Sequence, residues 1–186
     1  MIVRIVLRAR RSSSVESRFV HPMSPTPRTA ILAPGFQQTK LVRVFAAGWC
    51  EEAARFQPTS IAGTVEQLRG LTRISGISLS HAVVVFTSQG EAGLSSSDRD
   101  LFWKSFGVPV FEQRLGPRNE LIAMECEAHA GLHMVGDFSH LRRDKNTCAC
   151  GNPAPRLPGP ARRPRPAQPV DLVRRPKTEQ AAALSA

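Results

Sequence analysis

One apolar stretch decides the fold: residues 81–87 read His81-Ala82-Val83-Val84-Val85-Phe86-Thr87, between Ser80 and Ser88. A strand with one face in water alternates apolar and polar residues, because successive side chains point to opposite faces. An uninterrupted apolar run is instead typical of a parallel-sheet strand that is covered on both faces. The stretch therefore predicts a central strand with packing partners on both sides.

Strand and helix signals alternate ahead of this stretch. Residues 41–45 alternate like a half-buried strand. Apolar residues recur at helical spacing over residues 49–56 and predict a short helix that ends before Pro58. Thr64 and Gln67 have the types and spacing of a capping box, which predicts a second helix at this point.

The same alternation continues after the stretch. Ser97 is expected to cap a third helix that ends at Gly107 and has Leu101, Phe102 and Phe106 on its buried side. Further strands are expected over residues 108–111 and 121–126. Strands that alternate with helices are typical of layered domains. The predicted fold class is α/β with a mainly parallel sheet.

Charge and composition divide the chain into three parts. Residues 1–30 carry six Arg and one Glu, and the Pro-rich residues 158–186 carry six basic and two acidic residues. We expect both segments to be disordered. Residues 31–157, the expected folded core, carry 13 basic and 12 acidic residues, as an ordinary surface does. The net charge of +10 thus belongs to the tails, and no specific nucleic-acid binding is predicted.

The sequence contains no apolar stretch near the ~20 residues of a membrane helix, so no membrane span is predicted. Residues 1–20 are rich in Arg and Ser and lack the pattern of a secretory signal. They fit a disordered leader, a wrongly assigned start or a mitochondrial presequence. A cytoplasmic location is expected, and in a reducing compartment clustered cysteines indicate a metal site more often than a disulfide.

Four residues with metal-binding side chains lie near the end of the expected core. They follow in the order Cys126, His133, Cys148 and Cys150. Structural zinc is held by four tetrahedral ligands, and three thiolates with one imidazole are a common set. Gly151 would let the chain turn sharply after the Cys-x-Cys pair. The pattern predicts one structural zinc site.

The residues alone leave alternatives open. His129 precedes His133 by four positions and is a rival imidazole ligand. Cys126 can also end a buried strand as a small apolar residue, with the Cys-x-Cys pair in a surface loop. Cys50 is expected to pack in the core rather than to take part in chemistry.

Several sequence blocks occur in a characteristic order. They are residues 57–64 (Gln-Pro-Thr-Ser-Ile-Ala-Gly-Thr), 87–91 (Thr-Ser-Gln-Gly-Glu), 106–110 (Phe-Gly-Val-Pro-Val), 125–133 (Glu-Cys-Glu-Ala-His-Ala-Gly-Leu-His) and 148–151 (Cys-Ala-Cys-Gly). Over residues 41–157 the chain resembles the phenylacetate–CoA ligase branch of the AMP-forming acyl-CoA ligases. The order of the Glu-Cys-Glu-Ala and Cys-x-Cys-Gly blocks is the most specific part of this resemblance.

The resemblance implies the α/β core of an adenylate-forming ligase and a ligand of nucleotide or CoA type. Gly90 and Glu91 stand where the family's Gly-Ala-Glu turn meets adenine, so weak binding of ATP or AMP is expected there. An ordinary strand–helix turn is the alternative. Glu125 stands near the family's substrate, or else is a solvated edge carboxylate. The family block ends in Leu-His, which favours His133 over His129 as the zinc ligand.

Parts that the family needs for catalysis are missing from this sequence. The chain has no Tyr, so residues 114–117 and Glu120 replace the family's Tyr-Gly-x-x-Glu turn. It also lacks a Gly/Ser/Thr-rich phosphate loop and a lid with a catalytic Lys, and Mg²⁺ is not expected. We predict no catalytic residue and a truncated or accessory ligase-like protein. The alternatives are a non-catalytic zinc-stabilised protein-binding module, or half of a split ligase with a complementary chain.

Overall fold

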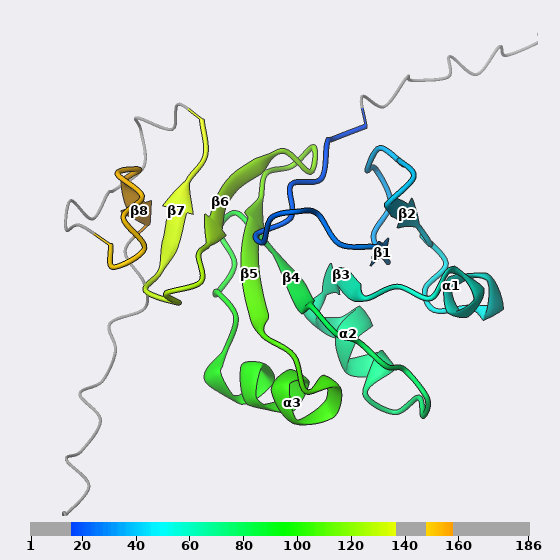
Figure 1. Ribbon diagram of the computed structural model, residues 1–186. Coiled ribbons are helices and arrows are strands. Elements are labelled where there is room, and N and C mark those ends of the chain that lie inside the picture. Colours follow the sequence, from blue (N-terminus) through cyan, green and yellow to red (C-terminus); the bar gives the residue numbers. More distant parts are fainter. Residues whose placement is uncertain (1–15, 137–147, 158–186) are drawn as a thin grey trace, which may run out of the picture.

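The computed structural model describes residues 16–136 and 148–157. In them, eight strands form one sheet in the order β2-β1-β3-β4-β5-β6-β7-β8 (Figure 1). The strands are β1 (Thr29–Ile31), β2 (Val42–Val44), β3 (Ser60–Thr64), β4 (Ala82–Ser88), β5 (Val110–Leu115), β6 (Leu121–Glu125), β7 (Leu132–Met134) and β8 (Arg156–Leu157). The helices are α1 (Glu51–Phe56), α2 (Val65–Leu71) and α3 (Ser96–Phe106). The predicted α/β class is confirmed.

The sheet has a parallel half and an antiparallel half. Strand β1 pairs in parallel with β2 and β3, and the β3–β4 and β4–β5 pairs are also parallel. The β5–β6, β6–β7 and β7–β8 pairs are antiparallel. The expected mainly parallel arrangement therefore holds for the first part of the chain. After β5 the connection through residues 116–120 is too short for a crossover, so the next strand returns as a hairpin.

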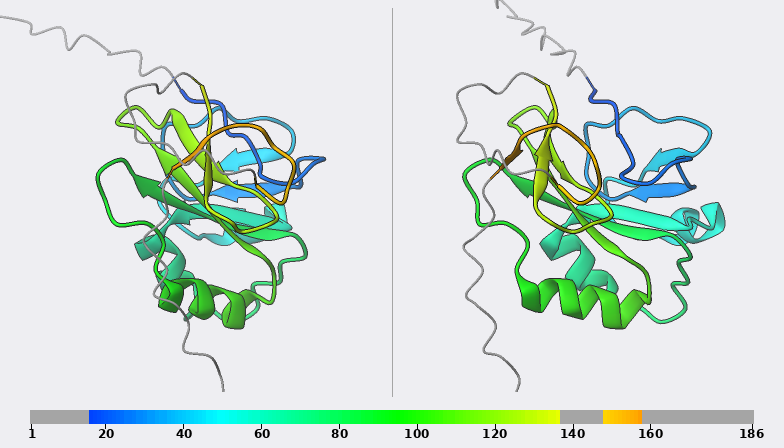
Figure 2. Two further views of the ribbon diagram at one scale, coloured as in Figure 1. Left: turned by 90° about the vertical axis from the view of Figure 1, so that its left-hand side faces the viewer. Right: turned by 60° about the vertical axis from the view of Figure 1, so that its left-hand side comes forward.

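Strand β4 is buried on both faces, as its apolar sequence predicts. Val83 and Val85 belong to one core cluster, together with residues of α2 and α3. Val84 and Phe86 belong to a second cluster on the other face. Figure 2 shows α2 and α3 together on one side of the sheet. The other side is covered by residues that precede and follow β1.

This second cover lies partly in residues 16–30, which the sequence analysis assigned to a disordered segment. In the structure, this segment includes the first two residues of β1, and Phe19 is buried. The Phe19 ring meets the rings of Phe36 and Phe86 edge-on, with centroids 6.2 and 6.1 Å apart. A three-residue strand among prolines leaves no periodic pattern in the sequence. The rest of the expected leader, residues 1–15, and the expected tail from residue 158 lie outside the described residues.

Local signals predicted α1 and α2 well. Helix α1 ends before Pro58, as expected, but Cys50 is its exposed N-cap and not a core residue. The N-cap precedes the first helical turn, and the buried residue of this helix is Ala53. At α2 the capping box is confirmed: the Gln67 N–H donates to Thr64 Oγ1 at 3.3 Å, and the Thr64 N–H donates to Gln67 Oε1 at 2.9 Å.

Helix α3 begins earlier than predicted. Ser95, rather than Ser97, is the N-cap, and its hydroxyl accepts a hydrogen bond from the Asp98 N–H at 3.1 Å. Of the residues predicted on the buried side, Phe102 is fully buried as expected, but Leu101 is 38% exposed. Leu101 and Phe102 are neighbours on a helix, so only one of them can point at the sheet.

Strand β5 follows directly. Gly107 ends α3 with a positive φ of 68°, as predicted. The strand begins after Pro109 and not at residue 108, because proline has no N–H for the ladder. It runs on to Leu115 because the buried polar side chains in its second half have partners; Gln113 Nε2, for example, donates to a backbone carbonyl at 2.7 Å.

None of the helices in the described residues is long and apolar enough to cross a membrane.

His21 joins the N-terminal segment to the sheet, and it is buried. Its Nε2 lies 3.0 Å from the hydroxyl of Ser60, a residue of β3. Burial lowers the pKa of His21 from 6.5 to about 4. Between these two pH values the unfolded chain binds a proton that the folded protein does not bind, which favours unfolding.

We therefore expect acid to destabilise the fold through His21. Above pH 6.5 His21 is neutral in both states and leaves the free energy of unfolding unchanged, and this free energy then decreases as the pH falls from 6.5 toward 4. Between pH 7 and pH 5 the free energy of unfolding should fall by about 2 kcal/mol more in the wild type than in His21→Gln. Urea denaturation of both proteins at both pH values measures this difference. An equal fall in the two proteins would show that His21 does not cause it.

Candidate metal centre

The four predicted metal ligands meet at the antiparallel end of the sheet. Cys126 directly follows β6, and His133 lies in β7. Cys148 and Cys150 lie in the segment before β8. Because β6 pairs with β7 and β7 pairs with β8, these strand pairs bring together residues that are up to 24 positions apart, from 126 to 150.

The four donor atoms lie close enough together to share one metal ion, and two of their distances are close to those of a tetrahedral zinc site. All four lie within 4.8 Å of one another. Cys126 Sγ is 3.7 Å from Cys148 Sγ, and Cys150 Sγ is 3.3 Å from His133 Nε2. Around zinc, tetrahedral geometry separates two sulfur atoms by about 3.8 Å and a sulfur from a nitrogen by about 3.5 Å. A disulfide would need about 2.05 Å, and these cysteines are free thiols. The cluster can therefore hold a metal ion.

The imidazole of His133 is oriented for this role. Its Nδ1 lies 3.2 Å from the carbonyl oxygen of Ala154, to which the Nδ1–H tautomer donates a hydrogen bond. That tautomer leaves the lone pair of Nε2 directed at the thiols. Histidines that bind metals usually donate their other ring N–H in this way. His133 is only 2% exposed, so its ring is held in this orientation by its surroundings.

The Cys-x-Cys segment forms a tight turn, as Gly151 predicted. Gly151 has a positive φ of 76°, which a residue with a Cβ rarely adopts. The Asn152 N–H points back to Cys150 Sγ at 3.4 Å. This contact helps to hold the Cys150 side chain against the turn, facing the other ligands.

The thiols differ in their affinity for protons. The Cys150 backbone N–H lowers the pKa of Cys148 to about 6, and the neighbouring side chains of His133 and Cys126 act in the same direction. Burial raises the pKa of Cys126 to about 11. One thiolate beside a neutral thiol is the expected state of a thiol cluster without a cation, because adjacent negative charges repel. A bound dication stabilises all the thiolates at once.

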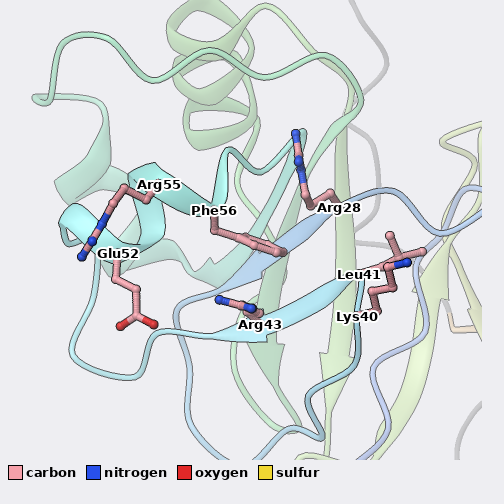
Figure 3. A pocket seen from close by; sticks show the side chains of 7 residues that line it. All are labelled: Arg28, Lys40, Leu41, Arg43, Glu52, Arg55 and Phe56. Atoms are coloured by element: carbon pink, nitrogen blue, oxygen red, sulfur yellow. The ribbon is translucent and has the colours of Figure 1, made fainter.

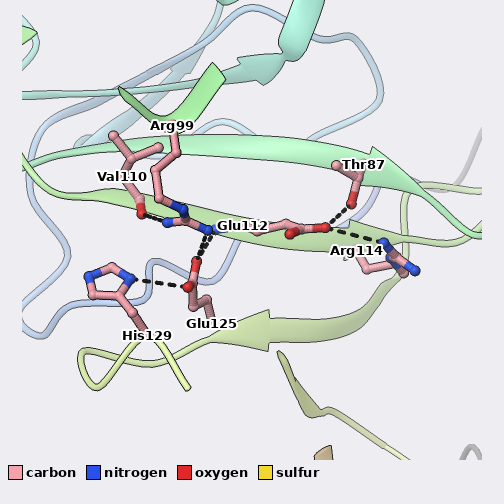
Figure 4. Close-up of polar contacts among 7 residues, drawn as sticks. All are labelled: Thr87, Arg99, Val110, Glu112, Arg114, Glu125 and His129. Carbon is pink, nitrogen blue, oxygen red and sulfur yellow. Dashed lines mark hydrogen bonds and ion pairs between the residues drawn. The ribbon is translucent and has the colours of Figure 1, made fainter. Parts of the chain in front are cut away.

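His129, the rival ligand, lies outside the cluster. Its Nδ1 is 3.1 Å from Glu125 Oε1 (Figure 4). Its ring stacks on Phe111 with the centroids 5.0 Å apart and the planes inclined by 24°. The structure thus places one imidazole, that of His133, among the three thiols and gives His129 a different set of partners.

Glu125 is the centre of a buried polar network that the sequence analysis missed. Its Oε2 accepts hydrogen bonds from Arg99 Nη2 and from the Glu112 backbone N–H, each at 2.9 Å (Figure 4). Arg99 also donates to the Val110 carbonyl. The Glu125 side chain is 5% exposed, so the expectation of a solvated carboxylate is wrong. Because Cys126 is the next residue, this network fixes where the first metal ligand leaves the sheet.

A second buried carboxylate lies beside the first. Glu112 Oε1 accepts hydrogen bonds from Thr87 Oγ1 at 2.8 Å and from Arg114 Nη2 at 3.2 Å (Figure 4). Both carboxylates could have been noticed in the sequence, because each is an acidic residue within an apolar strand pattern. The sequence does not show which residues they pair with, because Arg99 is 26 positions from Glu125.

The predicted nucleotide turn lies apart from the metal cluster. Gly90 has a positive φ of 89°, and Glu91 Oε2 accepts a hydrogen bond from the Ser88 N–H at 3.1 Å. Gly90 and Glu91 are both exposed. Strands β5 and β6 separate β4, which carries this turn, from β7, which carries His133. The two sets of predicted residues therefore do not form one site.

No protein-family model, curated protein or solved structure matches this chain. The relation to adenylate-forming ligases thus stays a prediction from the sequence. The convergence of three thiols and one imidazole is the feature of the described residues that speaks most directly about function.

The Arg99–Glu125 pair offers a test of how the metal-bearing loop is anchored. Arg99→Ala leaves a buried carboxylate without its cation and should lower the free energy of unfolding by about 3 kcal/mol. The exposed Arg55–Glu51 pair, at 3.9 Å, is a matched control. Arg55→Ala should cost less than about 1 kcal/mol. Chemical denaturation measures both, and similar losses in the two variants would contradict a special role for the buried pair.

Proposed function

We propose that this chain is a non-catalytic binding module that a structural zinc ion stabilises. The observation that supports this proposal is the convergence of Cys126, His133, Cys148 and Cys150. Sulfur and imidazole ligands in tetrahedral spacing favour zinc over harder cations. Four protein ligands also fill the coordination shell, whereas catalytic zinc keeps a position open for water or substrate.

A structural ion has a clear task at this end of the sheet. Strand β7 has three residues and β8 has two. The apolar cluster beneath them is small and consists of Ile122, Ala123 and Leu132, with Leu157 packed against it. So few apolar contacts stabilise strands weakly. Zinc binding adds folding free energy where the hydrophobic core is insufficient.

Metal analysis tests this proposal directly. Purified wild-type protein should contain about one zinc ion per chain. Cys148→Ser and Cys150→Ser should each lose most of it, because a serine hydroxyl is a poor replacement for a thiolate. Elemental analysis after gel filtration gives the stoichiometry.

Cys50→Ser is the control for these variants, because Cys50 is the exposed N-cap of α1 and not part of the cluster. It should keep the full zinc content. A wild-type protein without metal after reconstitution in excess zinc would refute the proposal. Zinc that is lost equally from Cys50→Ser would show that the binding is unspecific.

A second candidate is a truncated or accessory AMP-forming ligase. It is supported by the sequence resemblance and by the place of the Gly90–Glu91 turn, which follows the carboxyl end of β4. Strand β4 is parallel to both of its neighbours. Ligands of α/β proteins commonly bind at the carboxyl ends of parallel strands. Under this candidate the turn would hold AMP weakly, without a loop for the phosphates of ATP.

AMP titration separates this candidate from the zinc module. Weak binding, in the millimolar range of about −4 kcal/mol, should fall by about tenfold in Glu91→Gln. Glu66→Gln changes an exposed carboxylate on α2 and should bind like the wild type. No carboxylic-acid-dependent exchange of pyrophosphate into ATP is expected from the chain by itself. A zinc-loaded protein that binds no AMP would remove the ligase candidate and leave the zinc module intact.

A further inference from the structure

A basic pocket opens at the end of the sheet opposite the metal centre. It has a volume of about 590 Å³ and lies beside β2, the first strand in the sheet order (Figure 3). Four basic side chains, those of Arg28, Lys40, Arg43 and Arg55, line it around the ring of Phe56, with Glu52 as the acidic residue of the lining. A volume of this size is typical of a small-molecule site.

The Phe56 ring holds two of the guanidinium groups in place. The Cζ of Arg43 lies 5.3 Å from the ring centroid and the Cζ of Arg28 lies 6.0 Å from it. Figure 3 shows one group above the ring and the other below it. These cation–π contacts restrict side chains that are otherwise flexible, so less entropy is lost when a ligand binds. With both faces covered, the ring serves to position charge rather than to stack on a ligand.

The positive charge of the pocket is only partly offset by neighbouring carboxylates. Within residues 16–136 and 148–157, no ion pair is formed by Arg28, Lys40 or Arg43. Arg55 has a loose partner in Glu51, at 3.9 Å, and both side chains are exposed. Four like charges around one opening repel one another, and a multivalent anion would relieve this repulsion.

The pocket is separate from both sites described above. Arg28 precedes β1, Lys40 precedes β2, and Phe56 ends the helix that precedes β3. These positions are the amino ends of three parallel strands. The Gly90–Glu91 turn follows the carboxyl end of β4, which is parallel to β3. The pocket and the turn therefore lie at opposite ends of the parallel strands.

We propose that this pocket binds a small phosphorylated ligand with at least two phosphate groups. Guanidinium groups match phosphate oxygens with paired hydrogen bonds, which they do better than ammonium groups. One phosphate group carries a charge of about −1.5 to −2 at neutral pH. Two such groups balance a lining with four cations and one carboxylate. The net charge of this lining is +3, so a monocarboxylate would leave two positive charges without a partner and a single sulfate would leave one.

Calorimetric titration of the full-length, zinc-loaded protein with inorganic pyrophosphate tests the proposal. The wild type should bind pyrophosphate about tenfold more tightly than inorganic phosphate. Arg43→Gln and Lys40→Gln should each weaken the binding of pyrophosphate by about tenfold. Lys40→Gln leaves the Arg–Phe56 contacts intact, so it tests charge without disturbing that arrangement.

Arg73→Gln is the matched control, because Arg73 is an exposed arginine just beyond α2 and does not line the pocket. It should bind pyrophosphate as the wild type does, and an unchanged zinc content shows that each variant is folded. Absence of pyrophosphate binding, or equal loss in Arg73→Gln, would overturn the proposal. The proposal would also be overturned, in favour of a nucleic-acid surface, by a single-stranded oligonucleotide that binds far more tightly than pyrophosphate and whose binding is lost in Arg43→Gln.

Discussion

Strand β4 has no face in contact with water, and much of the molecule is arranged to keep it covered. Its side chains alternate between a cluster shared with α2 and α3 and a cluster shared with Phe19 and Phe36. Each such side chain contributes about 1.5–3 kcal/mol when it is fully buried. Loss of one cover would expose Val83 and Val85, and loss of the other would expose Val84 and Phe86. The segment around β1 is therefore as much a part of the domain as the helices are.

Strand β5 joins this parallel core to the antiparallel half that carries the metal ligands. It is parallel to β4 and antiparallel to β6. The junction contains two buried carboxylates, those of Glu112 and Glu125, which is tolerable because each has an arginine partner. The Arg99–Glu125 pair also ties α3 to the end of β6. The Cys/His cluster thus depends on the core through a charge pair as well as through backbone pairing.

The two ends of the sheet differ in chemistry. At the β7–β8 end, thiols and an imidazole form a soft, partly buried cluster that suits a cation. At the β2 end, guanidinium and ammonium groups surround an open pocket that suits an anion. The two sites share no residue, and five strands stand between β2 and β7 in the sheet order, namely β1, β3, β4, β5 and β6. Mutations can therefore remove either site without touching the other.

The sequence by itself determined those features that depend on local patterns. Strand β4 follows from an uninterrupted apolar run, α2 from its capping box, the end of α3 from Gly107, and the three cysteines of the candidate metal site from residue type and order. Tertiary structure alone decided which distant residues meet. It placed residues 16–30 in the fold, left Cys50 and Leu101 exposed, and paired Arg99 with Glu125. It also separated two histidines that the residue pattern leaves equivalent: His129 pairs with Glu125, while the β6–β7 register sets His133 opposite Met124 and among the thiols. The partner of Arg99 lies 26 positions along the chain, and strand register depends on how separate strands pair, so no local pattern encodes either.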